Sequence, residues 1–343
     1  MAAPHRGAEP WNCTSKDRFK CVHVERDDDG VLLVQLRNRG RSLVWGGLPH
    51  KELPELFAMI ASDRDNRVMV LTGSGEDFIS LGEPGAPNPL AEGRIRPESW
   101  EQIIHEGNRL VHQLLEIDVP IICALNGPVV AHSELAVLCD IVIAAEHAYF
   151  QDAPHFPGGL VPGDSMQIVW PMLLGPNRGR YFLLTGEKIG AAEAKQLGIV
   201  GEVLPAAEVL PRAMALAHEL AQRNPILLRH TRHVLVRPWK KAMAEDLHLG
   251  LSLEAIASLS ARTLGGGGVS DPGQADAELL DAFGGVRIDA DNAAHHWGLL
   301  ERRLLINRCD DCGHWHHPPR SVCQRCWSRS ITPPMWPATV SSP

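Results

Sequence analysis

The chain has 343 residues and a formal net charge of −8, with 44% hydrophobic and 22% charged residues, which is the composition of a soluble globular protein. The acidic balance argues against a nucleic-acid partner or an anionic membrane surface, because both require a basic footprint. The first residues lack the apolar core of a signal peptide, and no later run has the length of a membrane span. We therefore expect a cytoplasmic protein with no membrane partner.

The length predicts one core of about 250 residues and a second, smaller unit. Residues 1–19 carry little pattern and are expected to form a loose tail. The four consecutive glycines Gly265–Gly268 cannot hold an element together, so they mark the clearest boundary. We predict a main domain over residues 20–263, a Gly-rich linker over 264–285 and a small C-terminal unit over 286–343.

The first half of the main domain alternates expected strands and helices. Short apolar runs bounded by Gly, Pro, Asn or Asp predict strands, and apolar residues at helical spacing predict helices. The strands are expected at Val22–Glu25, Val31–Leu36, Val68–Leu71, Ile121–Leu125 and Ile141–Ala145, and the helices at His50–Ser62 and Trp100–Ile117. This alternation favours an α/β fold with parallel strands joined by crossover helices.

After Asp164 the pattern predicts helices and no further strand in the main domain. These helices are expected at Met166–Leu174, Arg178–Leu184, Ala191–Leu197, Val209–Arg223, Ile226–Val236 and Lys240–Arg262. The first half would then build the sheet, and the second half a helical layer. Beyond the linker, Asp291–Ile306 is expected to form one short helix.

Polar side chains follow the expected strands between Asn126 and Asp164. His132, Glu134, His155 and Asp164 lie in turns there, and ligands usually bind at strand ends in α/β proteins. From spacing alone, however, structural roles are the simpler interpretation, because the chain contains 17 histidines. Asp164 could equally cap the helix that begins at Met166.

A histidine paired with an aspartate can act as a general base, because the aspartate fixes the tautomer and stabilises the imidazolium. His155 and Asp164 are nine residues apart, so a bend through Pro157–Gly159 and Pro162–Gly163 is needed to bring them together. Such a base, with suitable oxyanion donors, can cleave a β-dicarbonyl with water and without a cofactor.

The segment from about Cys21 to Ala261 resembles the crotonase (enoyl-CoA hydratase/isomerase) superfamily, and within it most closely the β-diketone hydrolase branch represented by 6-oxocamphor hydrolase. The superfamily motifs are Asn126-Gly127, Glu134–Asp140 and Gly159–Gly163. Those of the branch are Ser42–Trp45, Phe150–Asp152, Pro154–Phe156, Val161–Asp164 and Asn177–Gly186. The resemblance implies a crotonase-like ββα spiral core with a C-terminal helical layer, assembled as a homotrimer or hexamer.

The departures from ordinary acyl-CoA hydratases concern their two glutamates and their Gly-Gly-Gly turn. Glu134 is kept, but the second glutamate position is His155, and Ala131-His132-Ser133 replaces the glycines. The hydratase acid–base pair is therefore broken. A side chain in that turn is also expected to crowd a thioester.

The resemblance to the branch implies a role for each residue of the site. His155 would activate water and Asp164 would orient it, while His132 and Trp45 would bind or polarise substrate carbonyls. Glu254 would complete the pocket, and Glu134 would help to bind the substrate. The implied activity is retro-Claisen hydrolysis of a cyclic β-diketone to a keto acid, with no cofactor for catalysis.

Two other interpretations stay open. One is a hydratase, isomerase or hydrolase of CoA thioesters whose acid–base pair has changed. The other is a non-catalytic crotonase-like scaffold with the C-terminal unit as its interaction module.

Four cysteines near the C-terminus form two CxxC pairs. They are Cys309, Cys312, Cys323 and Cys326, and ten residues separate the pairs. This spacing predicts a structural zinc with four thiolate ligands, with two redox pairs as a minor alternative.

The segment around the cysteines resembles the rubredoxin-like zinc ribbon of the DUF35 family, which accompanies enzymes of acyl-CoA metabolism. In that family an OB-fold follows the ribbon, but only 17 residues follow Cys326 here. We therefore expect the ribbon to dock a protein partner rather than to bind acyl-CoA.

Overall fold

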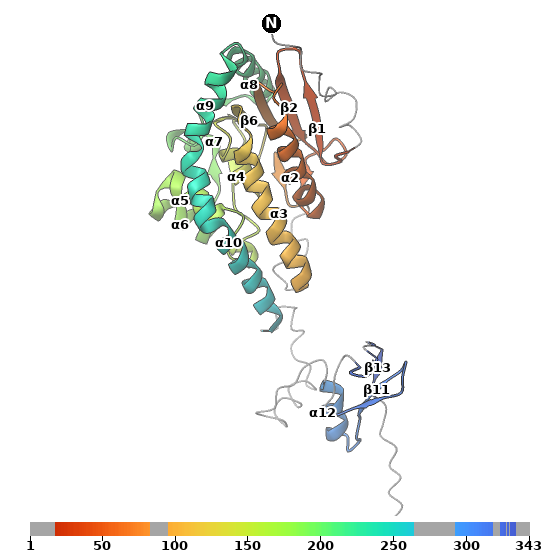
Figure 1. The fold of residues 1–343 in the computed structure, drawn as a ribbon. Coiled ribbons are helices and arrows are strands. Elements are labelled where there is room, and N and C mark those ends of the chain that lie inside the picture. The colour runs from red at the N-terminus through yellow and green to blue at the C-terminus, as the bar shows by residue number, and fades with distance from the viewer. Residues whose placement is uncertain are drawn as a thin grey trace, which may run out of the picture. The chain divides into compact units, whose positions relative to one another are not determined.

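The computed structural model describes residues 18–82, 95–263, 292–317, 323–326, 328 and 330–333, and the expected N-terminal tail and linker lie almost wholly outside them. The chain divides into two compact units, Met1–Gly267 and Gly268–Pro343 (Figure 1). Among the described residues, none of the helices combines the length and hydrophobicity needed to cross a membrane.

The larger unit is built on a six-stranded sheet with the strand order β1-β2-β4-β6-β7-β10. β1 and β2 form an antiparallel hairpin, and every other neighbouring pair is parallel. Every residue of β4 and β6 is buried, as their continuous apolar sequences require in a parallel sheet covered on both faces. The strands are β1 (Val22–Arg26), β2 (Val31–Leu36), β4 (Val68–Gly73), β6 (Ile121–Leu125), β7 (Ile141–Ala145) and β10 (Glu202–Leu204).

The prediction that strands stop after Asp164 was wrong. β10 pairs in parallel with β7, with Glu202 opposite Ile143, and its three residues are half-buried and too short to show an alternating pattern. Two-residue strands were also missed. β3 (Leu43–Val44) pairs with β5 (Ile79–Ser80), and β8 (Tyr149–Phe150) pairs with β9 (Ile189–Gly190).

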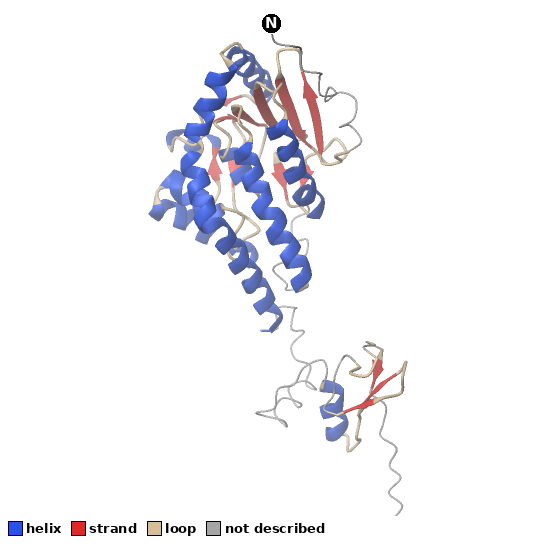
Figure 2. Ribbon diagram, in the orientation of Figure 1, coloured by secondary structure: helices blue, strands red, loops and turns tan. Residues whose placement is uncertain are grey.

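The predicted helices are all present in the larger unit, with ends shifted by a few residues, and the short α-helix α4 was not predicted. α8 packs against β2, β4, β6 and β7, while α10 packs against α3 and α5 (Figure 2). The bounds are α2 (Gly47–Ser62), α3 (Pro97–Glu116), the unpredicted α4 (Glu134–Val137), α5 (Met166–Leu174), α6 (Pro176–Thr185), α7 (Ala191–Gln196), α8 (Ala206–Ala221), α9 (Pro225–Leu235) and α10 (Arg237–Thr263).

A buried ion pair ties the helical layer to the sheet. Arg232 of α9 is 1% exposed, and its Nε donates to Asp140 Oδ2 at 2.8 Å. The same oxygen accepts a hydrogen bond from the backbone N–H of Ile121, the first residue of β6. Asn224 caps α9 by accepting from two backbone N–H groups, and Pro225 follows at the first helical position. These contacts fix the position of α9, and α10 follows directly after it in the chain.

The described residues of the smaller unit form the helix α12 (Ala293–Leu300) and a three-stranded antiparallel sheet in the order β12-β11-β13. The strands are β11 (Asn307–Cys309), β12 (Trp315–His316) and β13 (Ile331–Thr332). The predicted helix to Ile306 was too long. The chain turns after Leu300, where Arg302 has a positive φ of 57° and the Arg303 N–H donates to the Gly298 carbonyl.

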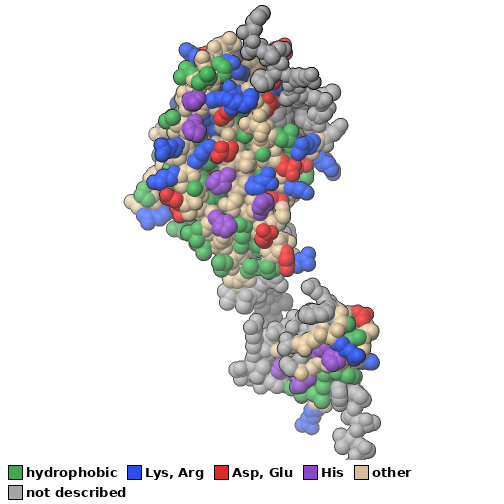
Figure 3. All heavy atoms as spheres, in the orientation of Figure 1, with side chains coloured by type: hydrophobic (Ala, Val, Ile, Leu, Met, Phe, Trp, Pro, Cys, Tyr) green, Lys and Arg blue, Asp and Glu red, His purple; other side chains and the backbone are tan. Residues whose placement is uncertain are grey.

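On the face of the larger unit that Figure 3 shows, charged side chains are spread widely and hydrophobic side chains gather at the end where α10 finishes.

Candidate active site

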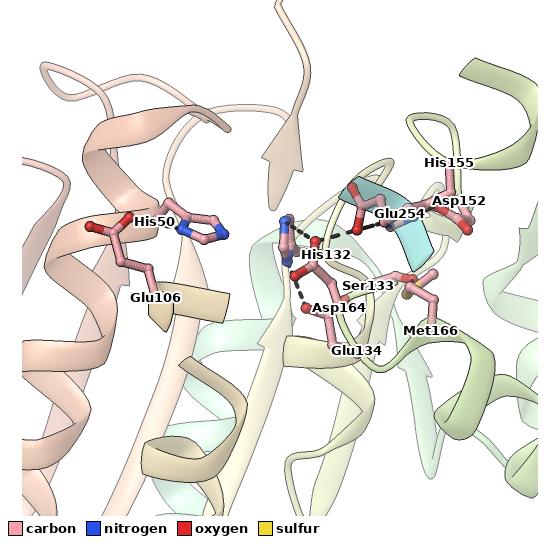
Figure 4. Close-up of polar contacts among 10 residues, drawn as sticks. All are labelled: His50, Glu106, His132, Ser133, Glu134, Asp152, His155, Asp164, Met166 and Glu254. Atoms are coloured by element: carbon pink, nitrogen blue, oxygen red, sulfur yellow. Dashed lines mark hydrogen bonds and ion pairs between the residues drawn. The ribbon is translucent and has the colours of Figure 1, made fainter. Parts of the chain in front are cut away.

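The structure brings four of the five predicted polar site residues of the larger unit into one buried cluster, and the fifth, Glu134, contacts it through His132 (Figure 4). His132 lies in the turn before α4, His155 lies between β8 and the 3-10 turn Phe156–Gly158, Asp164 lies before α5, and Glu254 projects from α10. Their exposed fractions are 4%, 2%, 7% and 3%. We call these four residues the acid–base cluster.

The two ring nitrogens of His155 have different surroundings. Its Nδ1 lies 2.6 Å from Asp152 Oδ1, and Asp152 is fully buried. Its Nε2 lies 3.8 Å from both Asp164 Oδ2 and Glu254 Oε2. The predicted bend is present, with Gly159 at a φ of 90°. Asp152 is therefore the carboxylate in hydrogen-bond contact with this ring, while Asp164 lies on the Nε2 side.

His132 has the same kind of arrangement. Its Nδ1 lies 2.7 Å from Glu134 Oε1, and its Nε2 lies 3.5 Å from Asp164 Oδ2. The Trp45 ring stacks on the His132 ring with centroids 3.6 Å apart. His132 adopts a φ of 48°, a conformation that costs a residue other than glycine about 1–3 kcal/mol. The surrounding contacts hold the ring in this strained position.

Asp164 lies between the two histidines. Its alternative interpretation as a helix cap is wrong, because Ser165 occupies the N-cap position of α5 and no side chain caps that helix. Asp164 itself has a φ of 48°, and its Oδ1 is buried without a hydrogen-bond partner among the described residues. Gly107 of α3 makes room for it, because a Cβ there would lie 3.0 Å from Asp164 Oδ1.

Glu254 enters the cluster from α10, as the family resemblance implied. Its Oε2 is buried, and within the described chain it has no hydrogen-bond partner. The neighbouring Gly163 is required for this approach, because a Cβ at that position would lie 2.1 Å from Glu254 Oε2.

The two histidines favour their protonated forms. Burial lowers the pKa of His155, but the Asp152 charge, the hydrogen bond that Nδ1 donates to Asp152 and the nearby Asp164 and Glu254 carboxylates outweigh it, so this pKa lies well above its usual value. Burial likewise lowers the pKa of His132, but the charges of Glu134 and Asp164 raise it by more than burial lowers it. The net pKa of His132 is therefore above its usual value.

The two carboxyl groups of the acid–base cluster shift in opposite directions. Burial raises the pKa of Asp164, but the His132 charge and the nearby His155 ring lower it more, so the net pKa is below its usual value. Burial raises the pKa of Glu254, and the contact with His155 only partly offsets that rise. Asp164 is therefore held as a carboxylate, while Glu254 can carry a proton. Divergent pKa values of this kind are typical of acid–base sites.

Sequence reasoning missed two residues of the site. Asp152 precedes His155 by three residues in a motif already noted, so the local sequence could have indicated that the two side chains pair. Nothing in the sequence around His50 indicated a site residue, because His50 stands at the beginning of an expected helix. In the structure its ring centroid lies 6.2 Å from that of His132, and its Nδ1 lies 3.1 Å from Glu106 Oε2.

The smaller unit carries the second predicted site. The Sγ atoms of Cys309 and Cys326 are 3.5 Å apart, as are those of Cys312 and Cys323, and all four lie within 4.8 Å of one another. Thiolates around a tetrahedral zinc, each about 2.3 Å from the ion, lie about 3.8 Å apart. The cluster therefore fits a structural zinc whose ligands all come from the chain.

Comparisons with known proteins give the same division of the chain. Residues 27–258 match the enoyl-CoA hydratase/isomerase family, and residues 296–332 match the ChsH2 rubredoxin-like zinc ribbon domain. A probable enoyl-CoA hydratase of Mycobacterium tuberculosis is 28% identical over 269 residues, which cover 76% of this chain and 92% of that protein.

Two solved structures are similar to the larger unit. A β-diketone hydrolase from the cyanobacterium Anabaena sp., bound to (S)-3-oxocyclohexyl acetic acid, is 40% identical with a TM-score of 0.67, and the match covers 71% of this chain and 96% of that one. An enoyl-CoA hydratase/isomerase from Mycobacterium paratuberculosis is 28% identical with a TM-score of 0.64, covering 71% and 98%.

Proposed function

This chain belongs to the enoyl-CoA hydratase/isomerase (crotonase) family, and we propose that within it the chain is a hydrolase that cleaves a carbon–carbon bond of a cyclic β-diketone. The crotonase fold and the rubredoxin-like zinc ribbon were both predicted from sequence and are confirmed. The similarity to a β-diketone hydrolase at 40% identity supports the narrower proposal.

One observation carries the proposal. His132 and His155 each have Nδ1 bound to a carboxylate of their own, and both Nε2 atoms face Asp164 Oδ2 (Figure 4). One ring can then take a proton while the other donates to a developing negative charge. Retro-Claisen cleavage needs both actions, because water must be deprotonated and an enolate must leave.

We assign the base to His155. In its neutral form, Nε2 takes a proton from water as the oxygen adds to one substrate carbonyl carbon. Asp152 stabilises the imidazolium that forms. The tetrahedral alkoxide then collapses to a carboxylic acid, the bond to the central carbon breaks, and its electron pair forms the enolate of the second carbonyl.

We assign the stabilisation of the enolate to His132. Its raised pKa favours the imidazolium, whose N–H can donate to the enolate oxygen. Trp45, stacked on the same ring, would hold it in place. A proton then returns to the enolate carbon from the His155 imidazolium, directly or through Glu254. The enzyme is restored, and one water has been added to the substrate.

A second candidate is acid–base chemistry on a CoA thioester. The match to the family and the 28% identical probable hydratase support it. The arrangement of Glu134 weighs against an ordinary hydratase, because Glu134 Oε1 is bound to His132 and a histidine stands at the second glutamate position. A CoA-dependent reaction would therefore require a different acid–base pair.

We also propose that the ribbon holds a structural zinc and docks a protein of acyl-CoA metabolism, and that the larger unit assembles as a trimer or hexamer. A groove of about 720 Å³ between α5, α6 and α10 supports the assembly, because it is lined by apolar side chains that include Leu184 and Leu249, each 56% exposed.

The cytoplasmic localisation expected from the sequence stays a prediction.

The test compares turnover of a bicyclic β-diketone such as 6-oxocamphor with turnover of crotonyl-CoA. The variants are wild type, His155→Ala and, as a matched control, His147→Ala, since His147 is exposed. We expect diketone cleavage in wild type and control and its loss in His155→Ala. Thioester turnover with an inert diketone would support the second candidate instead.

A further inference from the structure

The acid–base cluster also has the features of a metal site. His155 Nε2, Asp164 Oδ2 and Glu254 Oε2 come from three separate segments and converge on one point, with ligand atoms within 4.8 Å of one another. All three side chains are buried. One imidazole with two carboxylates is a donor set that suits divalent first-row transition ions.

The separations fit an ion. Two donor atoms that each lie about 2.1 Å from one ion are about 3.0–3.4 Å apart in octahedral or tetrahedral geometry. His155 Nε2 lies 3.8 Å from each carboxylate oxygen, which is too long for a hydrogen bond and about 0.4–0.8 Å wider than a coordination pair. A small closing movement of the side chains would complete the coordination.

Two further observations favour a cation at this point. Glu254 is 3% exposed, and its Oε2 faces the histidine without a hydrogen-bond partner among the described residues. His155 also binds Asp152 through Nδ1, at 2.6 Å. Histidines that bind metals usually donate their second ring N–H to a carboxylate in this way, which leaves Nε2 free for the ion.

We propose that His155, Asp164 and Glu254 form a second metal site, distinct from the zinc ribbon, that takes one divalent transition ion and inhibits the enzyme reversibly. The ion occupies the Nε2 lone pair that accepts the proton from water in the proposed function, so the inhibition rests on that function. Binding of the ion is independent of the proposed function, because binding needs only the three side chains.

Mn²⁺ is a suitable probe for the zinc-loaded full-length chain, because it prefers oxygen and nitrogen ligands and does not compete well for the ribbon thiolates. The loss of the free Mn²⁺ EPR signal counts bound ions directly. We expect one high-affinity Mn²⁺ per chain in wild type. Glu254→Gln, which keeps the shape of the side chain, and His155→Ala should each weaken binding by about 10-fold or more.

Glu245→Gln is the control, because Glu245 is an exposed glutamate of the same helix. It should bind Mn²⁺ as wild type does. Equal binding in wild type and Glu254→Gln, or no high-affinity ion in wild type, would overturn the site.

If Mn²⁺ lowers turnover over the concentration range in which it binds, and dilution restores the activity, the inhibitory role is supported. Binding with undiminished diketone turnover would overturn inhibition alone. A chain that binds Mn²⁺ but does not cleave diketones would refute the proposed function and leave the metal site standing.

Discussion

Asp152 Oδ1 lies 2.6 Å from His155 Nδ1, and both side chains are buried. The contact fixes the neutral ring with its proton on Nδ1, so Nε2 presents its lone pair to Asp164 and Glu254. An asparagine at position 152 would keep the shape, but it could present its NH₂ group to Nδ1 and stabilise the wrong tautomer.

We therefore expect Asp152→Asn to lower kcat by about 10³-fold or more while the fold is retained, since the corresponding change in a Ser-His-Asp triad has an effect of this size. Steady-state kinetics on the diketone, with far-UV circular dichroism as the test of folding, would measure it. Asp28→Asn is the control because Asp28 is exposed. A loss below 10-fold would assign Asp152 a structural role only.

The pH profile should report the raised pKa of His155. The base must be neutral to accept a proton, so kcat/KM should rise as pH rises through that pKa, above the usual value near 6.5, and fall again where His132 loses the proton that it donates to the enolate. Asp152→Asn removes the negative charge that contributes most to the increase. The rising limb should consequently move to lower pH in the variant. Profiles measured from about pH 6 to pH 10 that superimpose would contradict the assignment.

Gly163→Ala tests the position of Glu254 without changing a charged group. The new Cβ would lie 2.1 Å from Glu254 Oε2, so the carboxylate must move away while the backbone can stay. A displacement of about 1 Å in an active site can cost about 100-fold in rate, and we expect kcat to fall by about 10- to 100-fold. Gly190→Ala is the matched control, since a Cβ there would meet no atom within 4 Å. Equal kcat in the two variants would remove Glu254 from the mechanism.

The sheet could largely be predicted from sequence because its central strands are buried on both faces. Continuous apolar runs such as Ile121–Leu125 leave an unambiguous signal. β10 could not be found in this way, because Glu202–Leu204 becomes a strand only through pairing with β7. Its sequence alone is equally compatible with a loop.

The site shows the same division between local and long-range signals. Asp152 is three residues from His155, and the pairing was accessible to sequence reasoning even though Asp164 was preferred. Glu254 and His50 reach the cluster from helices distant in sequence, so their contacts depend on how α10 and α2 pack. Spacing carries no record of such packing, and only the family resemblance placed Glu254 there in advance.

Arg232→Ala should destabilise the larger unit by about 3–5 kcal/mol, because it leaves the partly buried Asp140 carboxylate without its charged partner. The lost hydrogen bonds to the backbone carbonyls of Leu115 and Ile117 add to the effect. Urea denaturation followed by tryptophan fluorescence measures the change. Arg223→Ala, at an exposed arginine, should stay within about 0.5 kcal/mol of wild type. Similar midpoints for the two variants would show that the pair does not anchor α9 to the sheet.

Zinc removal should affect the two units differently. Structural zinc sites of four thiolates contribute about 10–16 kcal/mol of apparent binding free energy, so the ribbon should unfold when the metal is removed. The candidate active-site residues all belong to the larger unit, and we expect diketone turnover to be retained. Metal analysis should find one more zinc per chain in wild type and in His314→Ala, whose histidine is exposed, than in Cys312→Ser. Amide NMR signals of the ribbon should collapse in Cys312→Ser alone. A ribbon that stays folded without zinc would refute the structural assignment of the four cysteines, and lost turnover with an intact larger unit would show that the ribbon takes part in the reaction.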